Sequence, residues 1–267
     1  MKHRWSVLIV IAAAAGVVVL SAQAVHRVKP QPIPVRFAEG MVHGFVDLHT
    51  ATGTLLANGD LLQVAKEGGI ESRMIFHFLD GSFFEETVLF TQQREFALRS
   101  YHLVQRGPAF ADDLDASLQA SGKYVVKTKS HGDGKVNQHD GTLNDMPPDV
   151  SNGLVITILK NLTRHDTQTV HLVAFTPQPQ MIALKLTPVG ERQVMIGQRT
   201  ETAVEFDLKP ELGAVKGFFA KLLGRLPPDS HVWIVIHEVP AFVRFEGPLY
   251  TGPVWRIDLG SPRWSRN

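Results

Sequence analysis

The sequence contains no cysteine, so it can form no disulfide bond and carries no site for a cysteine-linked lipid. The fold must therefore be stabilised by a hydrophobic core alone. With 267 residues, of which 44% are hydrophobic, the chain is long enough and apolar enough to build one.

An excess of charge of either sign is also missing, because 27 Lys and Arg side chains stand against 26 Asp and Glu side chains. A chain balanced in this way has no long-range field that would attract a polyanion. We therefore expect no nucleic-acid partner.

Familiar catalytic motifs are absent as well. The sequence has no Gly-x-Ser-x-Gly elbow, no His-Glu-x-x-His helix, no glycine-rich phosphate loop with a lysine, and no cysteine nucleophile. It therefore predicts no catalytic residue, no cofactor and no metal site, and it favours a non-catalytic protein.

One apolar run, Val7–Leu20, stands near the start of the sequence, with Lys2 and Arg4 before it and Ser21-Ala22-Gln23-Ala24 after it. This order of positive charge, apolar run and small-x-small site is typical of a cleaved secretory signal. The run is shorter than the roughly 20 residues that span a bilayer as a helix. We expect residues 1–24 to be removed and the protein to work in the periplasm or outside the cell, with no membrane span after cleavage. An uncleaved N-terminal anchor is the alternative.

The rest of the chain divides simply. Residues 25–36 alternate proline with other residues, which predicts an extended spacer because proline fixes φ and donates no hydrogen bond. Residues 37–260 show no comparable linker and are expected to form one β-rich domain. The polar stretch at 129–145 is interpreted as a long loop inside that domain, and 261–267 as a short tail.

Strand patterns dominate this domain. Asn58-Gly59 and Asp80-Gly81 are typical of tight hairpin turns, each between two apolar segments. Short connections between successive strands predict antiparallel neighbours in a meander. The expected strands cover residues 42–49, 54–57, 60–64, 70–79, 82–91, 95–105, 114–127, 168–176, 180–187, 192–199, 201–208, 231–238, 242–246 and 254–259.

Two segments have helical spacing instead. Val150–Leu162 follows Pro147-Pro148-Asp149, and Pro210–Leu226 has an apolar stripe and ends before Pro227-Pro228. The second, basic helix could lie on a membrane surface, but packing across the open sheet is the simpler interpretation. The expected fold is mainly β: an antiparallel meander that forms a curved open barrel or half-barrel, with two helices packed on it.

Candidate binding residues gather on two predicted strands. On the segment 231–238, His231 and His237 frame Trp233, which gives an apolar floor with polar ends, as in many ligand pockets. Phe76 and Phe78 form a similar apolar strip on 70–79. We predict that these five residues bind a lipid or another apolar small molecule. A central strand covered on both faces is the alternative explanation.

Histidines and carboxylates supply a second set of candidates. His43, Asp47 and His49 share one face of the strand 42–49 and could bind zinc or act as a base with an orienting acid. The two histidines are six residues apart, about 20 Å on a strand, so neither can share an ion with the other. The loop 130–141 offers oxygen and imidazole groups but lacks the terminal Glu of a calcium loop. A solvated face and ordinary turn residues explain both patterns equally well.

The order of the elements resembles that of a group of bacterial exported proteins. A long meander, the Pro-Pro-Asp helix at 147–162, a second meander and the closing strand Val254–Leu259 are arranged as in domain-of-unknown-function families with a wrapped half-barrel. The layout is also similar to that of periplasmic lipoprotein carriers, whose curved sheet holds acyl chains beneath a helical lid. The resemblance implies a bacterial envelope location and a hydrophobic ligand.

Three functions are compatible with these patterns. The first is a non-catalytic envelope protein that binds an apolar or amphiphilic ligand or an envelope protein partner. The second is a hydrolase or metal-dependent enzyme, which requires at least three of a set of six side chains to meet at one point. The third is a purely structural surface domain. The six side chains are those of His43, Asp47, His49, His77, His231 and His237.

Overall fold

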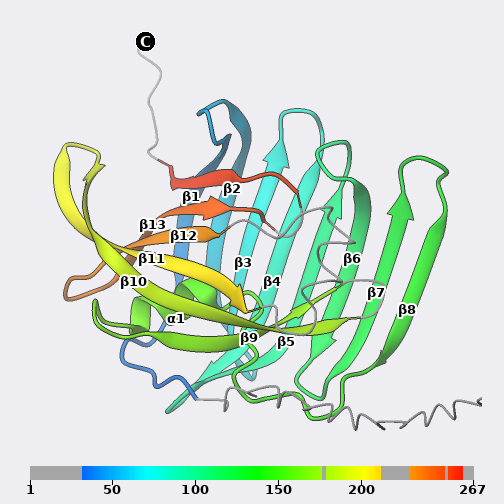
Figure 1. Cartoon of the computed structure of the whole chain (residues 1–267), viewed down its shortest axis with the longest axis horizontal. Coiled ribbons are helices and arrows are strands. Elements are labelled where there is room, and N and C mark those ends of the chain that lie inside the picture. The colour runs from blue at the N-terminus through cyan, green and yellow to red at the C-terminus, as the bar shows by residue number, and fades with distance from the viewer. Residues whose placement is uncertain (1–31, 176–178, 212–228, 250–251, 261–267) are drawn as a thin grey trace, which may run out of the picture.

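The computed structural model describes residues 32–175, 179–211, 229–249 and 252–260 of the chain. In these ranges fourteen strands form one sheet in which all neighbouring strands are antiparallel (Figure 1). The strands are β1 (Val42–Thr50), β2 (Leu55–Lys66), β3 (Gly69–Phe78), β4 (Phe83–Gln92), β5 (Phe96–Arg106), β6 (Asp112–Gln119), β7 (Lys123–Ser130), β8 (Val136–Thr142), β9 (Gln168–Ala174), β10 (Gln180–Ile196), β11 (Arg199–Glu211), β12 (Ser230–Val235), β13 (Ala241–Gly247) and β14 (Trp255–Leu259).

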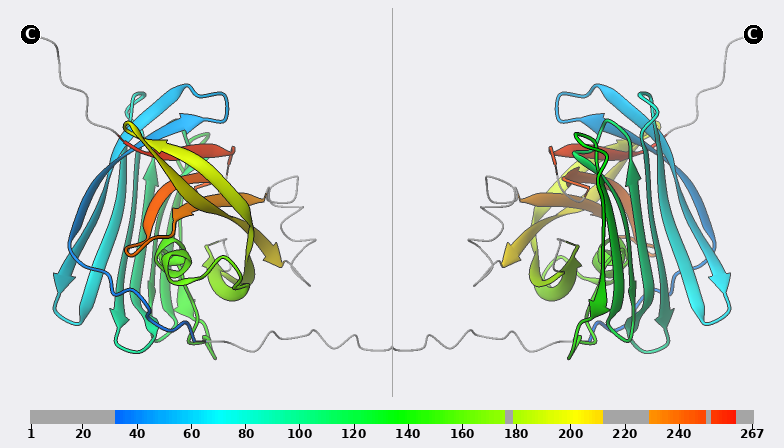
Figure 2. Two further views of the ribbon diagram at one scale, coloured as in Figure 1. Left: turned by 90° about the vertical axis from the view of Figure 1, so that its left-hand side faces the viewer. Right: turned by 90° about the vertical axis from the view of Figure 1, so that its right-hand side faces the viewer.

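The sheet consists of two meanders, β1–β8 and β9–β14, that are joined where β1 pairs with β14. Its open edges are β8 and β9, which are successive strands in the chain, with a helix between them. The two meanders curve toward each other and enclose the single described helix, α1 (Val155–Asn161) (Figure 2). The predicted mainly-β, antiparallel architecture is confirmed, and the sheet is open rather than a closed barrel.

The expectation of two helices is not met in the described residues, which contain one. Helix α1 is shorter than the predicted Val150–Leu162 because Gly153 adopts a φ of 72° and Val150 forms a parallel bridge with His171. The predicted helix Pro210–Leu226 begins with two residues that belong to β11, and the rest of it, 212–226, lies outside the described residues.

The predicted turn at Asn58-Gly59 is wrong, because both residues lie inside β2. Gly59 pairs with Phe76, and a Cβ atom on Gly59 would lie 2.6 Å from the Phe76 ring and 2.2 Å from the carbonyl oxygen of Ile75. The glycine therefore makes room for a core aromatic ring instead of forming a turn. The predicted turn at Asp80-Gly81 is confirmed, with a φ of 85° at Gly81.

Other strand boundaries also differ from the prediction, and β12, for example, ends at Val235 and not at residue 238. The expected strand 114–127 is split into β6 and β7 at Gly122, whose φ is 82°. The expected strands at 180–187 and 192–199 are joined in one strand, β10, which ends at Ile196 and has an irregularity between Pro188 and Gly190. The expected loop 129–145 contains β8, which is polar on both faces because it is an exposed sheet edge.

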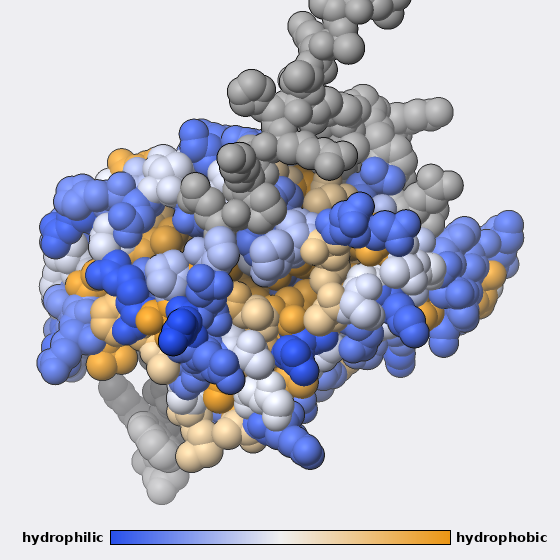
Figure 3. All heavy atoms as spheres, turned by 90° about the horizontal axis from the view of Figure 1, so that it is seen from below, coloured by the Kyte–Doolittle hydropathy of each residue, from blue (hydrophilic) through white to orange (hydrophobic). Residues whose placement is uncertain are grey.

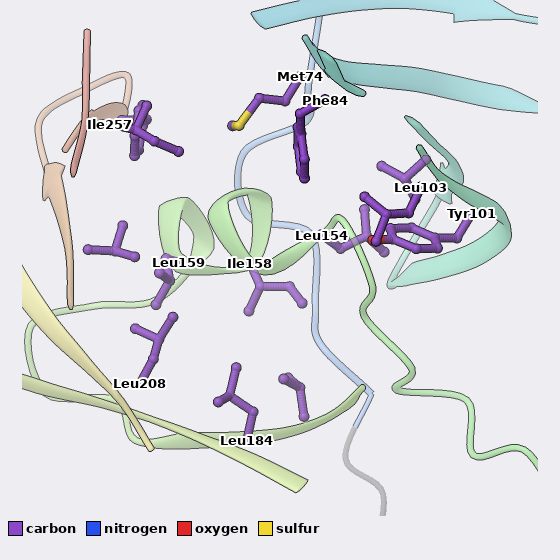
Figure 4. Packing of buried hydrophobic residues seen from close by; sticks show 14 of the residues in the cluster. Met74, Phe84, Tyr101, Leu103, Leu154, Ile158, Leu159, Leu184, Leu208 and Ile257 are labelled. Atoms are coloured by element: carbon purple, nitrogen blue, oxygen red, sulfur yellow. The ribbon is translucent and has the colours of Figure 1, made fainter. Parts of the chain in front are cut away.

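Apolar side chains of both meanders pack around α1. Leu154, Ile158 and Leu159 are almost fully buried and lie between residues of the two halves of the sheet (Figure 4). Burying each such side chain contributes about 1.5–3 kcal/mol. The helix is therefore part of the core, and it holds the two halves of the sheet around it.

The described end of the proline-rich segment also packs on the domain. Ile33 is 3% exposed, and its carbonyl accepts a hydrogen bond of 3.0 Å from the amide of Phe96 in β5. The Asn161 side chain at the end of α1 accepts hydrogen bonds from the amides of Arg36 and Phe37. Residues 32–37 thus form a strap between β5 and α1, and the core begins before Phe37.

No helix in the described ranges is both long enough and apolar enough to cross a membrane.

Candidate ligand cavity

A cavity of about 860 Å³ lies between the two halves of the sheet, beside α1. Ligand sites for small molecules span roughly 300–1,000 Å³, so the volume suits one small amphiphile. Most of the lining is apolar and comes from β1–β5 on one side and β9–β14 on the other. Figure 4 shows Met74 and Phe84 on one side of α1 and Leu184 and Leu208 on the other.

The cavity wall follows from the alternation of side chains along each strand. Residues with the same parity on one strand face the same side of a sheet. On β1, Val42 and Gly44 line the cavity, and Val46 continues the same face into the core. The strand registers then align Gly44, Leu61, Met74 and Glu86 in one row across β1, β2, β3 and β4. All four line the cavity.

The cavity wall reaches the surface where β14 ends. Val42 is 41% exposed and Leu259 is 37% exposed, whereas Val46 and Ile257, on the same face and deeper in the sheet, are 1% and 2% exposed. β14 pairs with β1 from Val46 onward, and the Gly260 amide donates a hydrogen bond to the Phe45 carbonyl, so no described strand pairs with Val42–Gly44 on that side. The lining also reaches the surface at the loop residues Ala111, Gly252 and Pro253.

The surface also shows apolar groups among polar ones. Seen from below, hydrophobic side chains appear near the middle of the face, between hydrophilic side chains (Figure 3).

Glu86 is the one acidic side chain of the described lining. Its Oε1 atom accepts a hydrogen bond of 2.7 Å from the hydroxyl group of Tyr101. Burial among protein atoms raises the pKa of the Glu86 carboxyl, and the hydrogen bond from Tyr101 opposes that rise more weakly. Glu86 keeps some accessible surface, since it lines the cavity.

Lys160 is the one basic side chain of the described lining, and it is already paired. Its Nζ atom lies 2.6 Å from the carboxylate of Glu39, and the two side chains are 15% and 6% exposed. Glu39 belongs to the segment that follows the strap, and it is held there by hydrogen bonds with Gln92. The positive charge of the lining is therefore neutralised within the protein.

The residues predicted on 231–238 lie away from this cavity. Val232 lines it, so the neighbouring side chains of His231 and Trp233 point to the opposite face of β12. His231 Nδ1 lies 3.2 Å from Asp207 Oδ1, and its ring centroid lies 6.0 Å from that of Trp233. His237 follows the end of β12 and is exposed, with Nε2 2.8 Å from Glu201. A ligand role for these three residues stays a prediction.

Phe76 and Phe78 share the cavity-facing side of β3 with Met74, and they are buried in the core next to the cavity. The Phe78 ring centroid lies 5.4 Å from that of Phe110 and 5.5 Å from that of Trp255. Their neighbours Met74 and Phe84 line the cavity instead. Ligand binding by Phe76 and Phe78 also stays a prediction.

The histidines proposed for an enzyme are distributed over separate positions. His43 pairs with Asp60 at 2.7 Å, His49 lies 3.6 Å from Asp258, and the His77 ring packs against Phe83. Over the described ranges, no three His, Asp or Glu side chains are grouped so that they could hold a metal ion.

The loop 130–141 is a turn followed by β8. His131 Nε2 lies 2.7 Å from Asp113 Oδ1, and Asp133 accepts a hydrogen bond from the Lys135 amide. These contacts are those of a closed turn.

Glu86 and Tyr101 were not among the residues predicted from the sequence. A signal for Glu86 was present: Phe84, Glu86, Val88 and Phe90 alternate on one face of a strand, and a carboxyl among three apolar side chains marks an unusual environment. No such signal marked Tyr101.

No protein-family model matches the sequence, and searches of curated proteins and of solved structures found no significant match.

Proposed function

We propose that the protein is an exported, non-catalytic binding protein of the bacterial envelope, and that it holds an apolar or amphiphilic molecule between the two halves of its sheet. The observation that carries this proposal is the cavity of about 860 Å³, with a mostly apolar wall. Transfer of apolar surface from water to such a wall is favourable by about 25 cal/mol per Å². The few polar groups of the lining would fix the orientation of the ligand.

The location outside the cytoplasm is part of the proposal. It is supported by the signal-like pattern of residues 1–24 and by the absence of cysteine, which leaves the fold independent of the redox conditions it meets. Fractionation of the host cells and N-terminal sequencing of the protein test this location. We expect a mature chain that starts at Val25, and its absence from the periplasmic and extracellular fractions would contradict the proposed location.

The alternative functions require different structural features. A hydrolase or metal-dependent enzyme needs converging histidines and carboxylates, and in the described part of the chain no metal-binding group of three is present. A structural surface domain, or a domain that binds only an envelope protein, needs no ligand in the cavity.

Native mass spectrometry of the mature protein, purified from its host without organic solvent, tests the binding function. We expect a mass increment from a bound small molecule, or saturable uptake of 1-dodecanol by the empty protein at one molecule per chain. An empty mass together with no uptake would contradict a ligand-binding function and would favour a structural domain.

A further inference from the structure

We infer that the ligand is a single-chain amphiphile with an uncharged polar head, that the head accepts a hydrogen bond from Glu86, and that the chain runs from there along the cavity toward Gly44. This inference rests on the proposed binding function and adds to it the chemical class of the ligand and its orientation.

The length of the ligand follows from the strand register. Gly44, Leu61, Met74 and Glu86 are direct neighbours across four adjacent strands, so Gly44 and Glu86 are three strand spacings apart, or roughly 14 Å. Leu61 and Met74, between them, are apolar. One leaflet of a bilayer core is about half of roughly 30 Å, so the row matches a single extended acyl chain.

The charge of the head follows from the lining. Lys160 is its basic side chain and already pairs with Glu39 at 2.6 Å. Within the described lining, a phosphate or carboxylate head would therefore lose its hydration without gaining an unpaired cation in exchange. The other polar side chains of the described lining, apart from Glu86 and Tyr101, are uncharged: Gln63, Ser72, Asn152, Thr157 and Ser230.

Glu86 determines which hydrogen-bonding group the head of the ligand must carry. Among the described lining residues, the other titratable groups are Tyr101, which donates a hydrogen bond to Glu86, and Lys160, which is paired with Glu39. The cross-strand neighbours of Glu86, Met74 and Leu103, are apolar, and burial raises the pKa of its carboxyl, which shifts the equilibrium toward the neutral form. With Oε1 occupied by Tyr101, the acid proton on Oε2 can be donated to a hydroxyl or carbonyl oxygen. An ammonium head would instead require the ionised carboxylate.

The test compares four ligands of equal chain length at pH 7: dodecane, 1-dodecanol, dodecyl phosphate and dodecylamine. Affinities for the full mature chain are measured by competition in native mass spectrometry. We expect the affinity for 1-dodecanol to be at least about fivefold higher than the affinity for dodecyl phosphate or dodecylamine. This difference corresponds to the net free energy of one hydrogen bond. Tighter binding of the phosphate or the amine would overturn the inference.

Variants assign the selectivity to Glu86. E86Q keeps a donor on the same strand and should retain the preference for 1-dodecanol, whereas E86L should reduce its affinity about tenfold and leave that of dodecane unchanged. E85L is the matched control, because Glu85 is the preceding residue and lies on the opposite face of β4. Circular dichroism verifies that each variant is folded.

The outcomes separate the two proposals. If all four ligands bind equally and E86L changes nothing, the head-group inference is wrong and the binding function stands. If no ligand binds to any folded variant, both proposals are wrong.

Discussion

The hydroxyl group of Tyr101 on β5 donates a 2.7 Å hydrogen bond to Oε1 of Glu86 on β4, on the face of the sheet that lines the cavity. The neighbours of Glu86 in its cross-strand row are Met74 and Leu103, both apolar. A carboxyl group in such a wall is unfavourable unless it is neutral and hydrogen-bonded. Glu86 and Tyr101 therefore place one hydrogen-bonded polar group in the otherwise apolar wall of the cavity.

The stability of the protein should depend on pH through Glu86. Its pKa is raised in the folded state, so the folded protein holds this proton more tightly than the unfolded chain. The contribution of Glu86 to stability is fully present below about pH 4.3, the ordinary value for a glutamate, and is lost as the pH rises through the folded-state pKa.

E86Q removes this titration, so its stability relative to the native protein should increase as the pH rises through that window. Urea unfolding of both proteins from pH 4 to pH 9 measures the difference. A difference that stays constant over this range would contradict the raised pKa.

Tyr101→Phe should raise the pKa of Glu86 further, because the hydrogen bond from Tyr101 stabilises the ionised carboxylate and lowers that pKa. Titration of the ¹³C-labelled glutamate side chains, followed by NMR, measures the change. A lower pKa in the variant would show that the hydroxyl group does not act on Glu86 in this way.

The ion pair between Lys160 and Glu39 should connect α1 to the N-terminal segment. Because both side chains are largely buried, replacing either one with alanine leaves an unpaired charge and should destabilise the fold by about 3–5 kcal/mol. The double variant should lose less than the sum of the two single losses, since it leaves no unpaired charge. A double-mutant cycle from urea unfolding measures this coupling, and additive losses would mean that the pair is not coupled.

Gly59→Ala should destabilise the protein by about 1–3 kcal/mol, the usual effect of overpacking a core. The added methyl group would meet the backbone oxygen of Ile75 and the ring of Phe76. Gly190→Ala is the control, because no described residue other than its two chain neighbours comes within 4 Å of a Cβ at Gly190. Equal thermal stability of the two variants would show that the close approach at Gly59 does not exist.

The general fold could be predicted from the sequence, because strand alternation and short turns depend on local patterns. Asp80-Gly81 formed a turn as expected, and the strands on either side of it lie within one residue of their predicted bounds. Asn58-Gly59 has an equally good local pattern, but its role is fixed by the ring of Phe76 on the next strand. β8 was missed for a related reason, since an exposed edge strand needs no apolar face.

The candidate site was less predictable, because it is formed by residues that lie far apart in the sequence. Trp233 and Val232 are adjacent in the chain, and only the curvature of the sheet decides which of them faces the cavity. Phe76 and Phe78 were predicted as a ligand-binding strip, but the depth of a side chain along its face of the sheet depends on the packing of α1 and the second meander. The pairing of β1 with β14, which joins the two ends of the domain, has no local signal.

The central claim, that the cavity is the binding site, is tested most directly at Gly44. Among the described residues, a Cβ atom on Gly44 would meet within 4 Å just the Leu259 side chain, at 3.8 Å, so Gly44→Phe should fold and place its ring in the cavity. Gly190→Phe adds the same ring in open space and serves as the control.

The measurement is a fluorescence titration with N-phenyl-1-naphthylamine, an uncharged apolar probe. The native protein and G190F should bind one probe per chain with equal affinity, and G44F should bind it about tenfold more weakly or worse, as expected when a side chain occupies a ligand's space. Equal affinity of folded G44F and native protein would place the probe elsewhere and contradict the account.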